Sequence, residues 1–271
     1  MNLPTFKATI RTVAVGMKNT FLSESNRAHR KRQQKADLLN PADRYTEWLR
    51  LFHEVEQPRV YLEIGVATGQ TLALKNNDTI GIGVDPAFSI QVPLTNVSLY
   101  REPSDSFFSF YRDSRRSETL SINMCFIDGL HEYRQVVRDI LNCAQHCSES
   151  AVMLIHDVIP PDAKSATAKR RTKLWPGDVY KALPFLHKHF AGIEIAIVRT
   201  APTGLAVITA PSSIRNAAIT TEILNGNEKA LEEFDGLSVD EYMSSWVPTF
   251  KNVEGTPDIK VVRALIGNGV S

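Results

Sequence analysis

The chain has few cysteines, no long apolar run and no excess of either charge, and each absence excludes a class of protein. Its 3 cysteines cannot build a disulfide framework in 271 residues, so a cytoplasmic location is expected. Apolar runs stay short of the roughly 18–20 residues that cross a bilayer, so no membrane span is predicted. The 31 basic and 30 acidic side chains nearly cancel, and 43% of residues are hydrophobic, as in soluble globular chains.

Charge is nevertheless distributed unevenly along the chain. Residues 1–35 hold eight basic side chains and one acid, Glu24, whereas residues 222–258 hold nine acids against Lys229 and Lys251. A basic N-terminal segment suits nucleic acid, an acidic lipid surface or an anionic substrate. It is equally explained by a solvated helix face, or by pairing with the acidic segment of the same or a neighbouring chain. We favour the structural explanation and expect no nucleic-acid partner.

Short apolar runs rich in β-branched residues recur from residue 59 onward and predict the strands of one sheet. The predicted strands are Arg59–Gly65, Thr79–Asp85, Asn96–Arg101, Ile122–Asp128, Ala151–Asp157, Gly192–Thr200 and Gly204–Ala210. The first five are nearly continuous apolar runs, which is typical of parallel strands buried on both faces. Residues 201–203 are too few for a crossover helix, so the last two strands are predicted to be antiparallel neighbours.

Apolar residues also recur at helical spacing, over His131–His146 and Gly177–Phe190. Strands and helices in this order predict an α/β fold with a mostly parallel sheet covered by helices. We divide the chain into a helical basic region (1–58), a sheet domain (59–211) and a helical acidic extension (212–271).

A glycine-rich turn follows the first predicted strand, in Glu63-Ile64-Gly65-Val66-Ala67-Thr68-Gly69-Gln70-Thr71. Glycines at the carboxyl end of a strand let a ligand lie against bare backbone. Asp85, twenty residues after Gly65, ends the second strand, where an acid can accept both hydrogen bonds of a ribose diol. The spacing G-x-x-x-G departs from the dinucleotide pattern, and Glu63 would repel a nearby phosphate. The turn therefore favours a positively charged nucleoside, with Glu63 acting directly, through water or by ordering the loop.

Together, E-x-G-x-x-x-G, the later acid and the strand rhythm resemble class I S-adenosylmethionine-dependent methyltransferases. The resemblance implies a Rossmann-like, seven-stranded sheet in the order 3-2-1-4-5-7-6, with S-adenosylmethionine as cofactor. It also implies an adenine contact after the third strand, where Ser104 and Asp105 match a Ser-Asp pair, although an ordinary helix cap explains these residues as well. The residues expected at the cofactor are Glu63, Gly65, Gly69, Thr71, Asp85, Ser104, Asp105 and Asp128.

Acids and histidines end the fourth and fifth predicted strands, in FIDGLH (126–131) and LIHDV (154–158). Ligands of open α/β sheets bind beyond the carboxyl ends of the strands, so these side chains are expected to converge. An alcohol becomes a nucleophile when a base removes its proton or a metal lowers its pKa. We therefore predict His131 as general base, with Asp128 and Asp157 holding a metal such as Mg²⁺. His156 is expected to act as a third ligand, a second base or a substrate contact.

These two segments also resemble the branch that contains macrolide-sugar and rhamnosyl O-methyltransferases and cephalosporin-hydroxylase-like proteins. In metal-dependent members, the positions of Asp128 and Asp157 are ligands and that of His131 is the base. His156 departs, because several of these members carry an acid there.

A long polar connection, residues 159–176, follows the fifth strand at the ligand end of the sheet. Such loops often act as lids or binding loops. Trp175 and the nearby Tyr180 are candidates for stacking on an acceptor. The basic residues of the loop suit a phosphate or carboxylate, and a solvated surface explains them equally well.

The sequence thus predicts methylation of a hydroxyl on a sugar, glycoconjugate or small natural product. The alternatives are a metal-free O- or N-methyltransferase, a nucleotide-dependent oxidoreductase and an inactive methyltransferase fold that serves as a binding subunit. The expected partner is a small-molecule or glycan acceptor, and a homodimer through the terminal helices is a further expectation.

Overall fold

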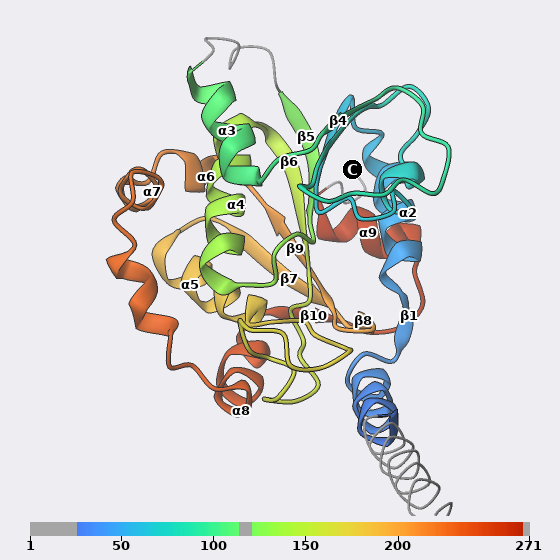
Figure 1. Cartoon of the computed structure of the whole chain (residues 1–271), viewed down its shortest axis with the longest axis vertical. Helices are drawn as coiled ribbons and strands as arrows, with labels where there is room; N and C mark the ends of the chain where they lie inside the picture. The colour runs from blue at the N-terminus through green and yellow to red at the C-terminus, as the bar shows by residue number, and fades with distance from the viewer. Residues whose placement is uncertain (1–25, 114–120, 268–271) are drawn as a thin grey trace, which may run out of the picture.

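A computed structural model of the chain describes residues 26–113 and 121–267 (Figure 1). The strands are β1 (Ala42–Arg44), β2 (Val60–Ile64), β3 (Ile80–Val84), β4 (Val97–Tyr100), β5 (Ile122–Ile127), β6 (Cys147–His156), β7 (Glu194–Val198), β8 (Thr200–Ala201), β9 (Leu205–Thr209) and β10 (Lys251–Val253). The helices are α2 (Tyr45–Glu56), α3 (Ser104–Asp113), α4 (Tyr133–His146), α5 (Ala182–His189), α6 (Ser212–Arg215), α7 (Ala218–Leu224), α8 (Val239–Glu241) and α9 (Ile259–Leu265). Residues 26–39 are helical as well.

The described residues form one large sheet in the order β10-β7-β9-β6-β5-β2-β3-β4. Strands β2 to β6 run parallel to one another in it, and β9 lies antiparallel between β6 and β7. The predicted order 3-2-1-4-5-7-6 is therefore confirmed, as is the antiparallel last pair. Because β2, β3, β5 and β6 are parallel, their carboxyl ends lie along the same edge of the sheet.

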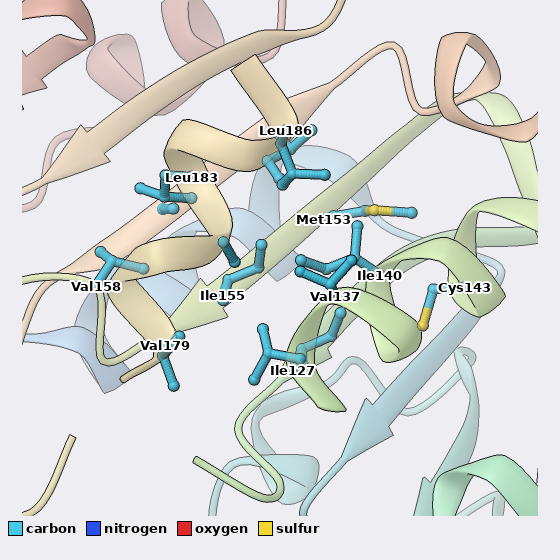
Figure 2. Close-up of a cluster of buried hydrophobic side chains, with 14 of the residues drawn as sticks. Ile127, Val137, Ile140, Cys143, Met153, Ile155, Val158, Val179, Leu183 and Leu186 are labelled. Atoms are coloured by element: carbon cyan, nitrogen blue, oxygen red, sulfur yellow. The ribbon is translucent and has the colours of Figure 1, made fainter. Parts of the chain in front are cut away.

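One face of the sheet is covered by α4 and α5, and its core is drawn in Figure 2. Side chains from β5 and β6 meet an apolar stripe of α4 there, for example Ile127, Met153 and Val137. These three side chains are at most 1% exposed. The stripe has the helical spacing that the sequence showed, so burial of one helix face follows from its pattern.

The opposite face is covered by α2 and α9, which come from the two ends of the described chain (Figure 1). Trp48, Leu49 and Phe52 of α2 are fully buried against this face, together with Val262 of α9. The sheet is thus covered on both sides, which explains why its central strands are apolar throughout.

The described large sheet has eight strands, one more than the seven expected. Lys251–Val253 of the acidic extension forms β10, which pairs in parallel with the outer strand β7. Three residues at a sheet edge carry no periodic pattern, so this pairing depends on the tertiary position of the segment. A separate small sheet joins β1 to β8, which lies in the connection between β7 and β9.

The acidic extension pairs with basic side chains of the sheet domain. Arg134 of α4 contacts Glu228 at 3.3 Å and Asp235 at 2.6 Å. Arg138 also bonds Glu228, and Lys188 bonds Glu233. Of the basic residues of 1–35, Lys7, Arg11 and Lys18 fall outside the described part, so their pairing stays a prediction. Among the described ones, Arg32 pairs with Asp162 of the sheet domain and not with the acidic extension. None of the described helices combines the length and apolarity that crossing a membrane requires.

Candidate active site

A cavity of about 820 Å³, which we call the main pocket, lies at the carboxyl ends of β2, β3, β5 and β6. Its wall includes most of the residues that the sequence singled out. The predicted residues that line it are Gly65, Thr71, Asp85, Ser104, Asp128, His131, His156 and Asp157. Glu63, Gly69 and Asp105 lie outside this lining.

Gly65 forms the closest backbone approach in the pocket. Its φ is +92°, and a Cβ atom added there would lie 2.1 Å from the carbonyl oxygen of Asp128. The amide of Gly65 donates to Val84 at 2.9 Å, while the amide of Asp128 donates to Ile64 at 2.9 Å. Glycine is therefore required both by conformation and by space, since the ends of β2, β3 and β5 meet at this point.

Glu63 orders the glycine turn from inside the protein. Its carboxyl group is fully buried and accepts hydrogen bonds from the hydroxyls of Tyr61 and Thr71, both at 2.7 Å. Burial raises its pKa to about 8, although these hydrogen bonds oppose the rise. Of the roles left open for Glu63, the structure shows loop ordering.

Asp85 also organises the turn. Its two carboxylate oxygens accept from the backbone amides of Ala67, at 2.8 Å, and Ala87, at 2.6 Å. A carboxylate has about four acceptor sites, so Asp85 retains capacity for two ligand hydroxyls.

Ser104 belongs to a polar cluster with Gln135 and Asp139 of α4. The hydroxyl of Ser104 donates to Asp139 at 2.6 Å, and the amide of Gln135 donates to the same oxygen at 3.0 Å. The second carboxyl oxygen of Asp139 is buried without a partner among the described residues. Burial raises the pKa of Asp139 to about 7, against the lowering by these hydrogen bonds. Asp105 instead pairs with Arg138 at 3.3 Å.

Sequence reasoning missed Asp139, although a signal was present. This acid lies three residues after Val136 and four before Cys143, within the apolar stripe of α4, and is 1% exposed. An acid at a core position of a helix indicates a buried interaction. Both Asp139 and Gln135 line the main pocket.

Asp128 and two imidazoles form the opposite end of the pocket. Nδ1 of His156 lies 3.2 Å from Oδ1 of Asp128, and Nε2 of His131 lies 3.4 Å from the same oxygen. Burial opposes ionisation of Asp128, but the charge of His156 and the bonds from both imidazoles hold its pKa below the usual range. Asp128 is therefore an anion at neutral pH.

His131 is fixed by acceptors on one side of its ring. Nδ1 lies 2.8 Å from the carbonyl oxygen of Trp175 and 2.9 Å from Oδ2 of Asp157, so this nitrogen carries a hydrogen. In the neutral ring the lone pair is therefore on Nε2, which faces Oδ1 of Asp128; the protonated ring carries a hydrogen on Nε2 as well and bonds to Asp128. Burial lowers the pKa of His131, but the hydrogen bonds and charges of Asp128 and Asp157 outweigh it and raise the pKa to about 11.

The segment around Trp175 packs directly on His131. The two rings stack with centroids 5.1 Å apart. Gly177 has a φ of +64°, and a Cβ there would lie 1.8 Å from the carbonyl oxygen of His131. Asp178 accepts from the amide of Tyr133 at 2.8 Å and so caps the start of α4. Tyr180, expected near the acceptor, is instead buried with its hydroxyl on Leu237.

His156 lies in the pocket wall rather than at its centre. It is 6% exposed, and Tyr45 covers it with ring centroids 4.1 Å apart. Burial lowers the pKa of His156, but the charges of Asp157 and Asp128 raise it overall. Tyr45 was missed by the sequence analysis because it lies before the first predicted strand, where no motif marks it.

Asp157 adopts a backbone conformation that is rare for a residue with a side chain, with φ at +66°. Such conformations cost about 1–3 kcal/mol and persist where the surroundings enforce them. The hydroxyl of Thr203, which is fully buried, donates to Oδ1 of Asp157. This conformation directs Oδ2 of Asp157 at His131, so the strained backbone places a carboxylate oxygen beside the imidazole.

The acid–histidine cluster (Asp128, His131, His156 and Asp157) offers a set of candidate metal ligands. One ligand atom each from Asp128, His131 and Asp157 lies within 4.8 Å of the others. The two carboxylates supply hard oxygen donors of the kind Mg²⁺ prefers. His156 already directs Nδ1 at Asp128, so it acts as a partner of a candidate ligand.

Residues 62–158 match the family model described as a methyltransferase domain. This segment begins in β2 and ends just after β6, so it contains the glycine turn, Asp85, Ser104 and the acid–histidine cluster. The predicted methyltransferase domain is confirmed for this segment. No curated protein sequence matches the chain.

Several solved structures are similar to the chain at low identity. Cofactor-bound Rv0187 from MTB is 15% identical with a TM-score of 0.44, over 62% of this chain and 79% of that one. A putative O-methyltransferase from Klebsiella pneumoniae is 11% identical with a TM-score of 0.40, over 61% and 79%. An O-methyltransferase from Bacillus cereus, in complex with SAH (S-adenosylhomocysteine), is 8% identical with a TM-score of 0.44, over 61% and 80%.

Proposed function

We propose that the chain transfers the methyl group of S-adenosylmethionine to a hydroxyl of a sugar, glycoconjugate or other small natural product. One observation carries the proposal: a single pocket joins the glycine turn and Asp85 to the acid–histidine cluster. A cofactor site and a proton-accepting site therefore share one cavity, as methyl transfer to an alcohol requires.

The cofactor lies along the glycine turn in this proposal. Bare backbone at Gly65 faces the nucleoside, and Asp85 accepts from the two ribose hydroxyls. The adenine reaches Ser104 and Asp139, where the unpartnered carboxyl oxygen of Asp139 can accept from an exocyclic amino group. The sulfonium lies toward Asp128, whose negative charge favours a cation.

The acceptor hydroxyl lies at Nε2 of His131. As the oxygen attacks the methyl carbon, the carbon–sulfur bond breaks and S-adenosylhomocysteine leaves. The hydroxyl proton passes to Nε2, while the Nδ1 hydrogen stays bonded to Asp157 and the carbonyl of Trp175. These two acceptors fix the ring and stabilise the imidazolium that forms.

Asp128 and Asp157 would hold a divalent cation such as Mg²⁺, because both present carboxylate oxygens beside the proposed acceptor position. When bound, the ion would offset the carboxylate charge that raises the pKa of His131 and would polarise the acceptor oxygen. Without that offset, a pKa of about 11 keeps His131 protonated at neutral pH.

Calorimetry with S-adenosylhomocysteine tests the cofactor assignment. The wild type and the control Asp78→Ala, which removes an exposed acid, should bind it equally. Asp85→Ala should lose at least about tenfold in affinity, since two charge-assisted hydrogen bonds are removed. Equal affinity in all three proteins, or preferential binding of NADH, would contradict the proposal.

Turnover after chelation tests the metal. Activity on an accepted hydroxyl substrate should fall with EDTA and return with Mg²⁺, and Asp157→Asn should abolish the recovery. Full activity in EDTA would identify a metal-free methyltransferase, and methylation confined to amines would identify an N-methyltransferase.

A further inference from the structure

A second cavity of about 320 Å³, which we call the basic pocket, lies beside the main pocket. His29 and Arg32, from the helix over residues 26–39, form one side of it. Lys164, Arg171 and Lys173, from the connection after β6, form the other. Figure 1 shows this connection and the helix meeting below the carboxyl edge of the sheet. Five basic side chains thus converge from two segments that are far apart in sequence.

Little of this charge is neutralised within the described part of the chain. Arg32 is 9% exposed and pairs with Asp162 at 2.7 Å. Lys173 contacts only a neutral oxygen there, that of Asn26, at 3.1 Å. Lys164 and Arg171 form no ion pair with any described residue. Four cations against one paired acid leave a net positive pocket.

A buried polar atom also points to a ligand. Nδ1 of His29 is buried and has no hydrogen-bond partner among the described residues. A buried nitrogen without a partner destabilises the free protein, and a hydrogen bond to an oxygen-rich ligand would remove that cost. The wall therefore combines uncompensated charge with an unused donor or acceptor.

The basic pocket adjoins the end of the main pocket that holds His131 and Trp175. Lys173 lines both cavities, and Arg170 and Trp175 line the main pocket beside it. The guanidinium of Arg170 lies 5.8 Å from the ring centre of Trp175, which in turn stacks on His131. A molecule with its hydroxyl at His131 can extend past Trp175 into the basic pocket.

We propose that the basic pocket binds a phosphate or diphosphate group of the methyl acceptor, so that the substrate is a phosphorylated or nucleotide-linked sugar or a similar phosphate ester. This inference rests on the proposed function. Several cations suit a multiply charged anion better than a single carboxylate. The planar guanidiniums bind phosphate oxygens bidentately, while the lysines add point charges.

Binding of inorganic diphosphate, followed by calorimetry at low salt, tests the pocket without turnover. The wild type and the control Lys229→Ala/Lys260→Ala, which removes two exposed lysines elsewhere, should bind it equally. Lys164→Ala/Arg171→Ala should bind it at least about tenfold more weakly, since charge-assisted bonds are lost. Equal binding by all three proteins, or none at millimolar diphosphate, overturns the proposal.

Turnover then links the pocket to the acceptor. Phosphorylated and nucleotide-linked sugars should accept a labelled methyl group, while matched neutral sugars should not. In Lys164→Ala/Arg171→Ala, KM for the acceptor should rise about tenfold or more with kcat nearly unchanged, because the altered side chains lie away from His131. Methylation of neutral sugars with equal kcat/KM overturns this inference and leaves the methyltransferase assignment intact. Failure of the wild type to bind S-adenosylhomocysteine overturns the proposed function instead. Diphosphate binding is measured without the cofactor, so it still tests the basic pocket in that case.

Discussion

The two ends of the main pocket are built in different ways. The glycine-turn end is made largely of backbone from consecutive residues, held by Glu63 and Asp85 through short-range hydrogen bonds. The acid–histidine end is made of side chains that come from β5, β6 and the segments carrying Trp175 and Thr203.

This difference teaches that seating a ligand and performing chemistry impose separate demands. The bare backbone of the glycine turn gives the ligand site its shape and contributes no charge that titrates. The acid–histidine cluster instead concentrates coupled charges in a partly buried site, where each shifts the pKa of the others. Substitutions at the first end should change affinity, and substitutions at the second should change turnover.

The largest expected effect comes from His131→Ala. Loss of a general base should lower kcat by about 10²–10⁴ while the affinity for S-adenosylhomocysteine stays unchanged. Stopped assays with labelled cofactor and parallel calorimetry measure the two quantities. His187→Ala is the matched control, because His187 is exposed and lies outside the pocket. Unaltered kcat in His131→Ala would remove His131 from the mechanism.

A smaller but still large effect is expected for Gly65→Ala. The added Cβ meets the backbone of Asp128, which cannot move aside as a side chain would, so the affinity for S-adenosylhomocysteine should fall at least about tenfold. Gly226→Ala is a close control, since Gly226 has the same φ of +92° and nothing within 4 Å of an added Cβ.

Gly226→Ala should lose about 1–3 kcal/mol of unfolding free energy from backbone strain, as urea titration measures, and Gly65→Ala should lose more because of the added clash. Only Gly65→Ala should also lose affinity. Equal affinities would show that the close approach at Gly65 has no part in cofactor binding.

The smallest expected effect concerns Asp139 and pH. Its pKa is raised in the folded protein to about 7, so the native state holds a proton that the unfolded chain releases near pH 4. The stability contributed by this group is full below pH 4 and is lost as pH rises to about 7. Between pH 5 and pH 8, the free energy of unfolding of Asp139→Asn should therefore fall by about 2 kcal/mol less than that of the wild type.

Urea midpoints at the two pH values measure this difference. Glu63, whose pKa is also raised, titrates alike in both proteins and cancels. Asp240→Asn removes an exposed acid and should follow the wild type. A variant Asp139→Asn with the wild-type pH dependence would show that Asp139 is not protonated in the folded protein.

Much of the fold could be predicted because its signals are local. Continuous apolar runs marked β2, β3, β5 and β6, and the short connection before Gly204 required an antiparallel pair. The edge strand β10 could not be predicted, since three residues from Lys251 to Val253 pair only where the chain happens to meet β7.

The candidate site divides in the same way. Gly65, Asp85, Asp128 and His131 were visible because each follows a recognisable strand. Tyr45, Thr203 and the partners of Trp175 were not visible, because their roles come from contacts between segments more than forty residues apart.

The amino-acid sequence by itself determined the α/β architecture, the glycine turn after β2 and the acids and histidines at the strand ends, since periodicity and strand ends are properties of neighbouring residues. Only the tertiary structure decided which nitrogen of His131 carries its hydrogen, that Asp139 is a buried acid in the pocket wall, and that five basic side chains surround one cavity. Protonation and charge density depend on distances through space, and folding alone sets those distances.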